Sequence, residues 1–248
     1  MNKIKLAFFS FASCEGCQLS FLELEDELPD ILQNVEIACF REASSVKLDR
    51  YDVAFIEGSI VQKRDIAVLR EIRRKAKYLV SFGACAASGG VNYMRNRFTD
   101  TQAFDTVYKG NQIVADLIKV HPVHKLVNVD YFMYGCPVSR SEFIRIYSMI
   151  MLGKKQGINN TPVCVECKLR ENLCLLIEGK PCLGPVTMCG CEAICTSSGF
   201  ECEGCRGLVE SPNLPGLREG FMLRGIDRSV LDEKIKIFNS SFEELSNG

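Results

Sequence analysis

The chain has 248 residues, 14 of them cysteines, and a formal net charge of −1 at pH 7. Hydrophobic residues make up 47% of it and charged residues 25%, a composition that excludes a largely disordered chain. Because 30 Lys and Arg residues are balanced by 31 Asp and Glu residues, the composition also argues against a nucleic-acid-binding protein, which needs a surplus of clustered cations.

The sequence shows no recognisable export signal or membrane-spanning segment. No apolar run reaches the length of a transmembrane helix. The apolar stretch near the N-terminus leads directly to Cys14 without a plausible cleavage site, and the Arg73-Arg74 pair lies too deep in the chain for a twin-arginine signal. We therefore expect a cytoplasmic protein without a transmembrane segment.

Short apolar stretches alternate with amphipathic stretches in the first part of the chain. The apolar patterns predict strands at residues 4–9, 35–40, 53–56, 78–82 and 126–134. The helical patterns cover residues 19–28, where leucines precede Pro29, and residues 64–76 and 139–152. Strands apolar enough to be buried on both faces, joined by short connections, predict an α/β fold with a doubly wound parallel sheet.

The composition changes at residue 154. Gly, Pro and Cys become frequent, helical and strand periodicity disappears, and no apolar run is long enough to build a core. Such a segment needs cross-links to be ordered, and metal clusters would supply them. Residues 230–245 predict an amphipathic helix. We expect a sheet domain at 1–153, a cysteine-rich segment dominated by loops at 154–215, and a helical tail at 216–248.

The first cysteines follow predicted strands. In a reducing compartment, 14 cysteines indicate metal or redox chemistry rather than disulfides. The Cys14-Glu-Gly-Cys17 motif, Cys85 and Cys136 each come shortly after a strand, with Gly16, Gly83 and Gly135 beside them. Because the carboxyl ends of parallel strands meet at one edge, these four thiols are expected to converge. Four thiolates are a ligand set for a cubane iron–sulfur cluster; buried core cysteines and structural zinc are the alternatives.

Nine further cysteines lie between residues 164 and 205. Zinc ribbons use paired C-x2-C knuckles, so Cys164 and Cys167 could form one site with Cys202 and Cys205. That arrangement leaves four cysteines unexplained: Cys174, Cys182, Cys191 and Cys195. Eight cysteines would instead fill two four-thiolate clusters, with Cys189 left over. The spacings alone leave zinc and iron–sulfur open.

Several motifs resemble those of the small, electron-transferring subunit of nickel–iron hydrogenases. They are CEGC at residues 14–17, EGS at 57–59, GACAASGG at 83–90 and YGCP at 134–137. The later motifs PVCVEC, CLGPVT, CGCEAIC and CEGCRG resemble the cytoplasmic branch, which includes sulfhydrogenase delta subunits and the methyl-viologen-reducing type. The resemblance extends to about residue 207 and implies a flavodoxin-like domain followed by a cluster-binding segment.

The resemblance implies three 4Fe–4S clusters. The proximal one would be held by Cys14, Cys17, Cys85 and Cys136. The distal one would be held by Cys164, Cys167, Cys174 and Cys182, and the medial one by Cys191, Cys195, Cys202 and Cys205. Cys164 stands where exported relatives have His, and Cys189 is an extra thiol that could be a bystander or replace Cys191. Cys39, in a predicted strand, is expected to be a core residue.

The resemblance also implies an electron-transfer role without a catalytic residue in this chain. The chain lacks the paired C-x2-C motifs, with accompanying Arg and His, that hold nickel in the large subunit. Electrons would pass between that subunit's NiFe centre and a diaphorase-type partner with flavin and iron–sulfur groups. The alternatives are a cluster subunit related to NADH:quinone oxidoreductase, against which CEGC and the eight-cysteine extension argue, and a zinc-stabilised assembly scaffold.

Three other polar residues are weak candidates. His121 and His124 could bind a metal, but two histidines near a proline are more often surface loop residues. Glu15, between Cys14 and Cys17, could relay protons to a partner, and a plain exposed carboxylate is an equally good interpretation.

Overall fold

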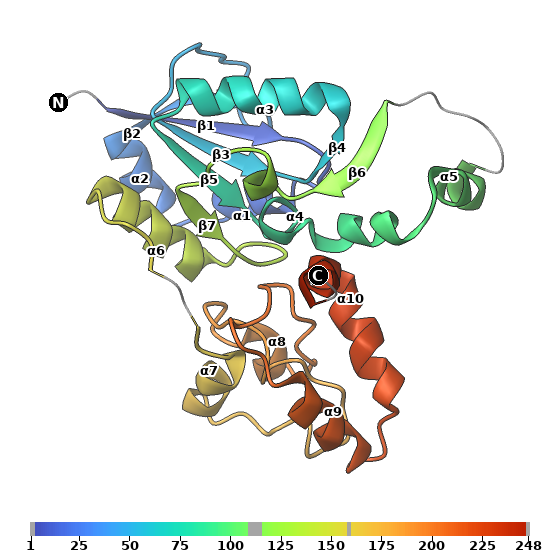
Figure 1. Ribbon diagram of the computed structural model, residues 1–248. Coiled ribbons are helices and arrows are strands. Elements are labelled where there is room, and N and C mark those ends of the chain that lie inside the picture. Colours follow the sequence, from blue (N-terminus) through green and yellow to red (C-terminus); the bar gives the residue numbers. More distant parts are fainter. Residues whose placement is uncertain (1–2, 109–115, 158–159, 247–248) are drawn as a thin grey trace. The chain divides into compact units, whose positions relative to one another are not determined.

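A five-stranded parallel sheet is the centre of the first half of the chain (Figure 1). The computed structural model describes residues 3–108, 116–157 and 160–246, and its contacts divide the chain into the units Met1–Met133 and Tyr134–Gly248. The sheet belongs to the first unit, in the order β2-β1-β3-β5-β7. The strands are β1 (Ile4–Ser10), β2 (Val35–Phe40), β3 (Val53–Glu57), β5 (Tyr78–Phe82) and β7 (Tyr131–Met133). This order is that of flavodoxin, so the predicted doubly wound fold is confirmed.

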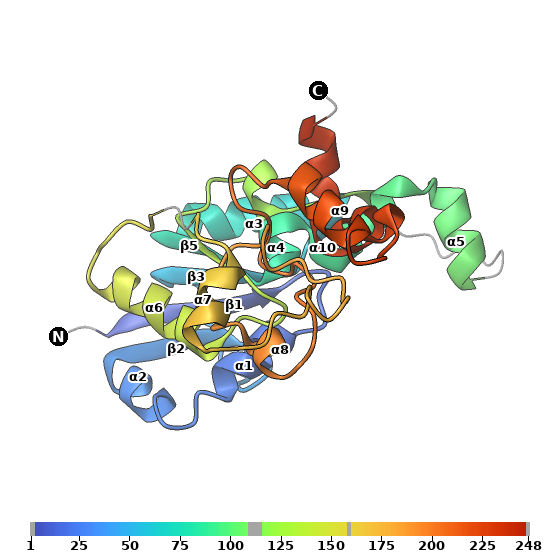
Figure 2. The same ribbon diagram turned by 90° about the horizontal axis from the view of Figure 1, so that it is seen from below.

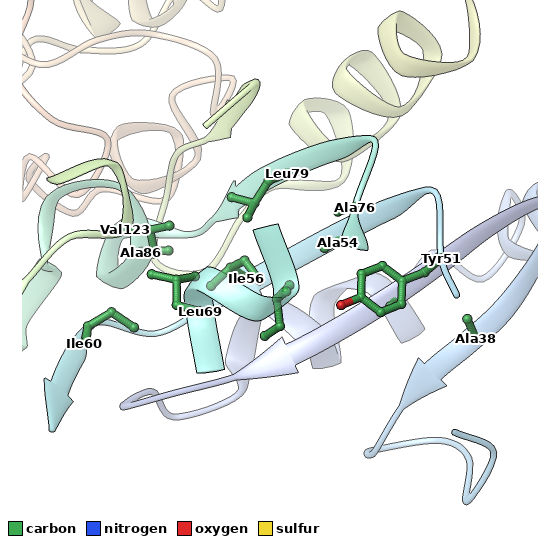
Figure 3. Packing of buried hydrophobic residues seen from close by; sticks show 12 residues of the cluster. Ala38, Tyr51, Ala54, Ile56, Ile60, Leu69, Ala76, Leu79, Ala86 and Val123 are labelled. Atoms are coloured by element: carbon green, nitrogen blue, oxygen red, sulfur yellow. The ribbon is translucent and has the colours of Figure 1, made fainter. Parts of the chain in front are cut away.

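Apolar side chains cover both faces of the sheet. Every residue of β3 is buried, and Phe8 of β1 stacks on Phe55 of β3 with ring centroids 4.7 Å apart. On the other face, the apolar side of helix α3 (Lys63–Lys75) packs on the sheet through Leu69 and Ile72. Figure 3 shows Leu69 in this cluster together with residues of β3 and β5. The strands are therefore buried on both faces, and the apolar side of α3 covers one of them.

Several elements of the first unit differ from the sequence prediction. The helix expected at 19–28 is replaced by α1 (Gly16–Leu22) and α2 (Leu28–Asn34), with Pro29 in the first turn of α2. A proline there loses no hydrogen bond, so it begins a helix instead of ending one. The strand expected at 126–134 shortens to β7, because Leu126 and Val127 bond back to Val123 in a turn.

The first unit also contains elements that the sequence patterns did not reveal. An antiparallel pair joins β4 (Ile60–Gln62) to β6 (Leu117–His121). The remaining helical segments are α4 (Ala84–Ser88), η1 (Gly90–Arg97), α5 (Asp100–Tyr108) and η2 (Val123–Lys125). Strands as short as β4 carry too little pattern to be recognised alone.

The second unit begins with a helix and continues into loops. Helix α6 (Arg140–Met151) confirms the helix expected at 139–152, and its N-cap Ser139 hydroxyl accepts the backbone N–H of Glu142 at 3.3 Å. The described part of the following segment contains only α7 (Val163–Leu169) and α8 (Ile194–Ser197). The predicted C-terminal helix is confirmed as α10 (Arg228–Ser246), which has non-helical torsions at Asn239.

The cysteine-rich segment nevertheless has its own apolar packing. Helices α9 (Leu214–Met222) and α10 lie side by side, as Figure 2 also shows. Their residues Phe221, Leu231 and Ile235 form a cluster with Leu183 and other residues of the loops. The expectation that the segment builds no core was therefore incomplete, because a helix C-terminal to it supplies the missing apolar face.

The two units meet in sequence at Met133 and Tyr134. The sequence predicted other boundaries, at residues 153 and 215, between a domain with the proximal cluster, a segment with the other clusters and a tail. These boundaries stay a prediction. None of the helices in the described ranges combines the length and apolar character needed to cross a bilayer.

Candidate iron–sulfur sites

The CEGC motif forms a tight turn between β1 and α1. Glu15 is the N-cap of α1 and has a left-handed backbone with φ 63°. A Cβ on Gly16 would lie 3.3 Å from the sulfur of Cys14, so glycine leaves room directly beside this thiol. Cys14 is exposed and Cys17 is buried. The turn thus presents one thiol outward and one inward.

Glu57, at the end of β3, accepts two hydrogen bonds from this turn. Its Oε1 accepts the backbone N–H of Cys17 at 3.1 Å, and its Oε2 accepts the side-chain amide of Gln18 at 2.9 Å. Burial raises the pKa of Glu57, and the hydrogen bonds from Gln18 and Cys17 counteract that rise. In the sequence, Glu57 was noted only as part of the EGS motif. Its position directly after the apolar stretch 53–56 was the signal that could have indicated a role.

Asn92 holds the residues that lead into the turn. Ala12 and Ser59 exchange two backbone hydrogen bonds at 3.0 and 3.2 Å. The side-chain amide of Asn92 donates to the carbonyl oxygen of Ala12 at 2.8 Å and to the Ser59 hydroxyl at 2.9 Å. A Cβ on Gly58 would lie 2.9 Å from the backbone of Ala12, so only glycine permits this close approach. No sequence pattern indicated Asn92, because its partners are remote along the chain.

Cys85 lies in α4, just after β5. A Cβ on Gly90, which has φ 53°, would lie 3.0 Å from the sulfur of Cys85. Only β3 separates β1 from β5 in the sheet, so the segments of Cys14 and Cys85 leave the sheet at the same edge. Glycine at position 90 therefore leaves room beside the thiol of Cys85, a predicted ligand.

Cys136 is the third residue after β7 and is described with the second unit. Gly135 before it has φ 127°, and Cys136 is exposed. Its backbone N–H donates a hydrogen bond to the sulfur of Cys205. Within this unit, the YGCP turn therefore lies next to a predicted medial ligand.

The predicted distal thiols interact with one another electrostatically. The pKa of Cys164 is raised to about 12, chiefly by burial and in smaller part by the thiolates of Cys182, Cys167 and Cys174. A Cβ on Gly184 would lie 3.4 Å from both the Cys164 and the Cys182 sulfur. The Cβ of Cys202, a predicted medial ligand, lies 3.9 Å from the same point.

Amide groups donate hydrogen bonds to the sulfurs of this group. The backbone N–H of Cys202 lies 3.4 Å from the Cys182 sulfur, and the side-chain amide of Asn172 lies 3.7 Å from the Cys167 sulfur. Burial raises the pKa of Cys182, while the N–H groups of Cys202 and Gly184 lower it. Such N–H···S bonds stabilise the thiolate form that binds metal.

The predicted medial thiols influence one another's pKa. Burial raises the pKa of Cys205 to about 11, and Cys191 and Cys195 contribute to the rise. Burial likewise raises the pKa of Cys202, and the thiolates of Cys182 and Cys205 contribute to the rise. Cys195 is exposed. Electrostatic interactions thus connect Cys191, Cys195 and Cys202 with Cys205.

The remaining candidates lie elsewhere. Cys39 packs against the apolar cluster beneath α3, as expected of a core residue. The backbone of Cys189 bonds to Thr161 and to Arg206. His121 ends β6, and the exposed His124 lies in the turn η2.

The donor set fits iron–sulfur clusters. Soft thiolates, N–H groups directed at sulfur and glycines beside the thiols are features of such sites. Bound iron would also remove the cost of the raised thiol pKa values, because a nearby cation displaces the proton. Across the described ranges, no three Cys, His, Asp or Glu side chains converge in the geometry of a single metal ion.

Comparison with known proteins places the chain in a family. A family model described as NADH ubiquinone oxidoreductase, 20 Kd subunit, matches residues 14–150, which is more than half of the chain. The chain belongs to this family. The match begins at Cys14 and ends in α6, and so includes the four predicted proximal ligands.

Within the family, this member is similar to hydrogenase subunits. It is 38% identical over 218 residues to sulfhydrogenase 2 subunit delta of Pyrococcus furiosus, covering 87% of this chain and 91% of that protein. It is 29% identical to a subunit of the F420-non-reducing vhu hydrogenase of Methanococcus voltae, covering 97% and 93%. These similarities confirm the resemblance to hydrogenase small subunits and favour it over the quinone-oxidoreductase alternative.

A solved structure agrees with the fold. A chain of an NAD+-reducing NiFe hydrogenase in the H2-reduced state is 28% identical to the present chain, with a TM-score of 0.58. The similarity covers 96% of that chain but only 63% of this one. The predicted flavodoxin-like fold is therefore confirmed.

Proposed function

We propose that the protein is the electron-relay subunit of a cytoplasmic nickel–iron hydrogenase. It would pass electrons between the NiFe centre of a large partner subunit and a diaphorase-type partner that carries flavin and iron–sulfur groups. The observation that carries this proposal is the pair of Cys164 and Cys182 sulfurs beside Gly184, together with the amide groups directed at the sulfurs of Cys182 and Cys167. The names of the relatives support the hydrogenase assignment.

We assign the cluster ligands as the sequence resemblance implies. The proximal 4Fe–4S cluster would be held by Cys14, Cys17, Cys85 and Cys136, because these residues follow β1, β5 and β7 of one parallel sheet. The distal cluster would be held by Cys164, Cys167, Cys174 and Cys182, and the medial one by Cys191, Cys195, Cys202 and Cys205. When bound, such clusters accept and release single electrons.

The protein's own residues would fix and tune these sites. Glu57 fixes the backbone of Cys17, and Asn92 fixes the segment before Cys14. The amide donors to Cys182 and Cys205 favour added negative charge on sulfur. Residues 1–153 would thus carry the proximal cluster, residues 154–215 the other two, and residues 216–248 would support them.

An apolar surface next to two exposed thiols suits the exit of electrons. We call it the α7/α8 patch: Val165, Leu169, Leu173 and Ile194. Leu169 and Leu173 are 80% and 78% exposed, and Ile194 is 63% exposed. Arg170 pairs with Glu192, and the side chain of Asn172 donates to the Ser197 hydroxyl at 2.9 Å, so α7 and α8 are joined here.

The partner at this patch would be a permanently bound subunit. Exposed Cys174 follows Leu173 directly, and exposed Cys195 follows Ile194. The exposed charged residues of the same segments cancel: Lys168 and Arg170 against Glu171 and Glu192. A transient carrier is usually guided by charge of one sign, whereas an apolar, neutral face is typical of a permanent interface.

The native complex tests the proposal. We expect a brown complex that contains the large subunit, four iron atoms for each of three clusters, and hydrogen-dependent reduction of a nicotinamide or another low-potential acceptor. Metal analysis, electron paramagnetic resonance and acceptor assays measure these properties. A colourless chain with zinc and no iron would instead establish the assembly scaffold.

A further inference from the structure

Arg206 is a buried cation in the second unit. Only 2% of its side chain is exposed. Its Nε donates a hydrogen bond to the carbonyl oxygen of Cys189 at 2.9 Å, and its Nη1 donates to that of Tyr134 at 2.8 Å. Its Nη2 lies 3.2 Å from Oε1 of Glu142, which is also buried. One side chain thus joins the YGCP turn, helix α6 and the segment before Cys191.

Glu142 does not fully cancel this charge, because two arginines share it. Its second carboxylate oxygen accepts a hydrogen bond from Arg145 at 3.0 Å. Arg145 is 44% exposed and therefore screened by water, whereas Arg206 lies in surroundings of low dielectric. Arg206, Arg145 and Glu142 together carry one net positive charge. Of the two arginines, Arg206 is the buried one.

The segment of Cys191 is shaped around this guanidinium. Gly190 has φ 117°, and a Cβ at this position would overlap Nη2 of Arg206. The Ser139 hydroxyl donates to the carbonyl oxygen of Gly190 at 3.2 Å. Arg206 also follows Cys205 directly in the chain. Its guanidinium therefore lies beside the segments that carry two predicted medial ligands, Cys191 and Cys205.

A carboxylate acts on the same segment with the opposite sign. Oε1 of Glu166 accepts the backbone N–H of Gly190 at 2.8 Å. Oε2 of Glu166 is buried and has no hydrogen-bond partner within the described residues. Gly190, the residue before Cys191, therefore contacts both a buried cation, Arg206, and a carboxylate, Glu166.

We propose that Arg206 is a positioning residue of the electron relay: it holds the segment of Cys191 against that of Tyr134 and raises the reduction potential of the medial site. The proposal rests on the proposed function, because it requires a cluster on the medial cysteines. Reduction adds one electron and one negative charge, which a buried cation nearby stabilises. Lysine would keep the charge but not the two hydrogen bonds that the guanidinium donates to the carbonyl oxygens of Cys189 and Tyr134.

The test is a redox titration of the hydrogenase complex, followed by electron paramagnetic resonance. In Arg206→Met we expect the medial midpoint potential to fall, and to fall more than the distal one. In Arg206→Lys we expect a smaller fall together with an altered medial line shape. Glu142→Gln should raise the potential, because it removes the anion that offsets Arg206. Arg145→Met, the control on the exposed side of Glu142, should stay near the wild type.

Each outcome decides the proposal. An unchanged medial potential in Arg206→Met with all iron retained would overturn it, as would shifts of the same sign in Arg206→Met and Glu142→Gln. If Arg206→Met does not assemble, the signs in Arg206→Lys and Glu142→Gln decide. A wild-type complex without a medial cluster, measured by its iron content, would overturn the proposed function along with this inference.

Discussion

Oε1 of Glu57, at the end of β3, accepts the backbone N–H of Cys17 at 3.1 Å, although 40 residues separate them. This bond ties the central strand of the sheet to the turn that carries two predicted ligands. Gln18, the next residue, bonds to the second oxygen of the same carboxylate. One buried side chain thus accepts hydrogen bonds from two residues at the predicted proximal site.

Replacing Glu57 by Gln is expected to loosen this turn. A glutamine offers one acceptor and one donor, so its NH2 group would oppose the NH2 group of Gln18. The loss of a buried hydrogen bond costs about 1–3 kcal/mol. We expect reduced iron content and a weakened proximal signal in the complex. Glu25→Gln, an exposed residue near α1, is the control; equal effects in both variants would contradict the role of Glu57.

Gly58→Ala tests the close approach between the EGS motif and the segment before Cys14. The new Cβ would lie 2.9 Å from the backbone of Ala12, and φ is +93°. Strain of this kind costs about 1–3 kcal/mol, and we expect lower thermal stability and loss of proximal iron. Gly153→Ala separates the two causes, because φ is +63° there but nothing lies within 4 Å. If Gly153→Ala lowered thermal stability as much as Gly58→Ala, the loss in Gly58→Ala would come from its positive φ and not from the contact with Ala12.

Cys164→Ala is expected to disrupt the distal cluster and the exit of electrons. Hydrogen-dependent reduction of the natural acceptor should then fall much more than hydrogen/deuterium exchange, which depends on the nickel site. Cys39→Ala is the matched control, since Cys39 packs beneath α3 and is outside the predicted ligand sets. If an intact complex lost both activities equally, the cysteine-rich segment would have a structural role instead.

Cys195→Ala is expected to convert the medial centre to a 3Fe species. With four thiolates the cube is complete, and removing one leaves a corner iron without its protein ligand. Electron paramagnetic resonance of the oxidised complex would show the new species, with proximal and distal signals retained. Cys189→Ala should leave the spectrum unchanged. An unchanged spectrum and iron content in Cys195→Ala would remove Cys195 from the ligand set.

Leu173→Ser is expected to weaken binding of the acceptor subunit at the α7/α8 patch. Burying a leucine side chain contributes about 1.5–3 kcal/mol, so affinity should fall roughly tenfold or more. High salt should have little effect, because exposed charges cancel at this face. Binding can be followed by native mass spectrometry. Leu223→Ser, equally exposed next to α9, is the control; if it weakened binding as much, the patch would not be the docking face.

The sequence by itself determined the order of the main elements. The strands at 35–40, 53–56 and 78–82 and the helices at 64–76 and 139–152 were predicted correctly, because apolar periodicity records which face of each element is buried. The residues of the cysteine motifs also carried the resemblance to hydrogenase small subunits. The shortened β7 and the β4–β6 pair escaped prediction, because three-residue strands depend on their partner more than on their own pattern.

Only the tertiary structure decided which side chains support the predicted sites. Glu57 meets Cys17, Asn92 meets Ala12, and Arg206 meets Tyr134 across separations of 40, 80 and 72 residues. Such contacts leave no periodic trace in the sequence, because a single polar residue looks the same whether it faces solvent or a distant backbone group. Burial strengthens the interactions of these residues, because a hydrogen bond or charge acts most strongly where water is excluded.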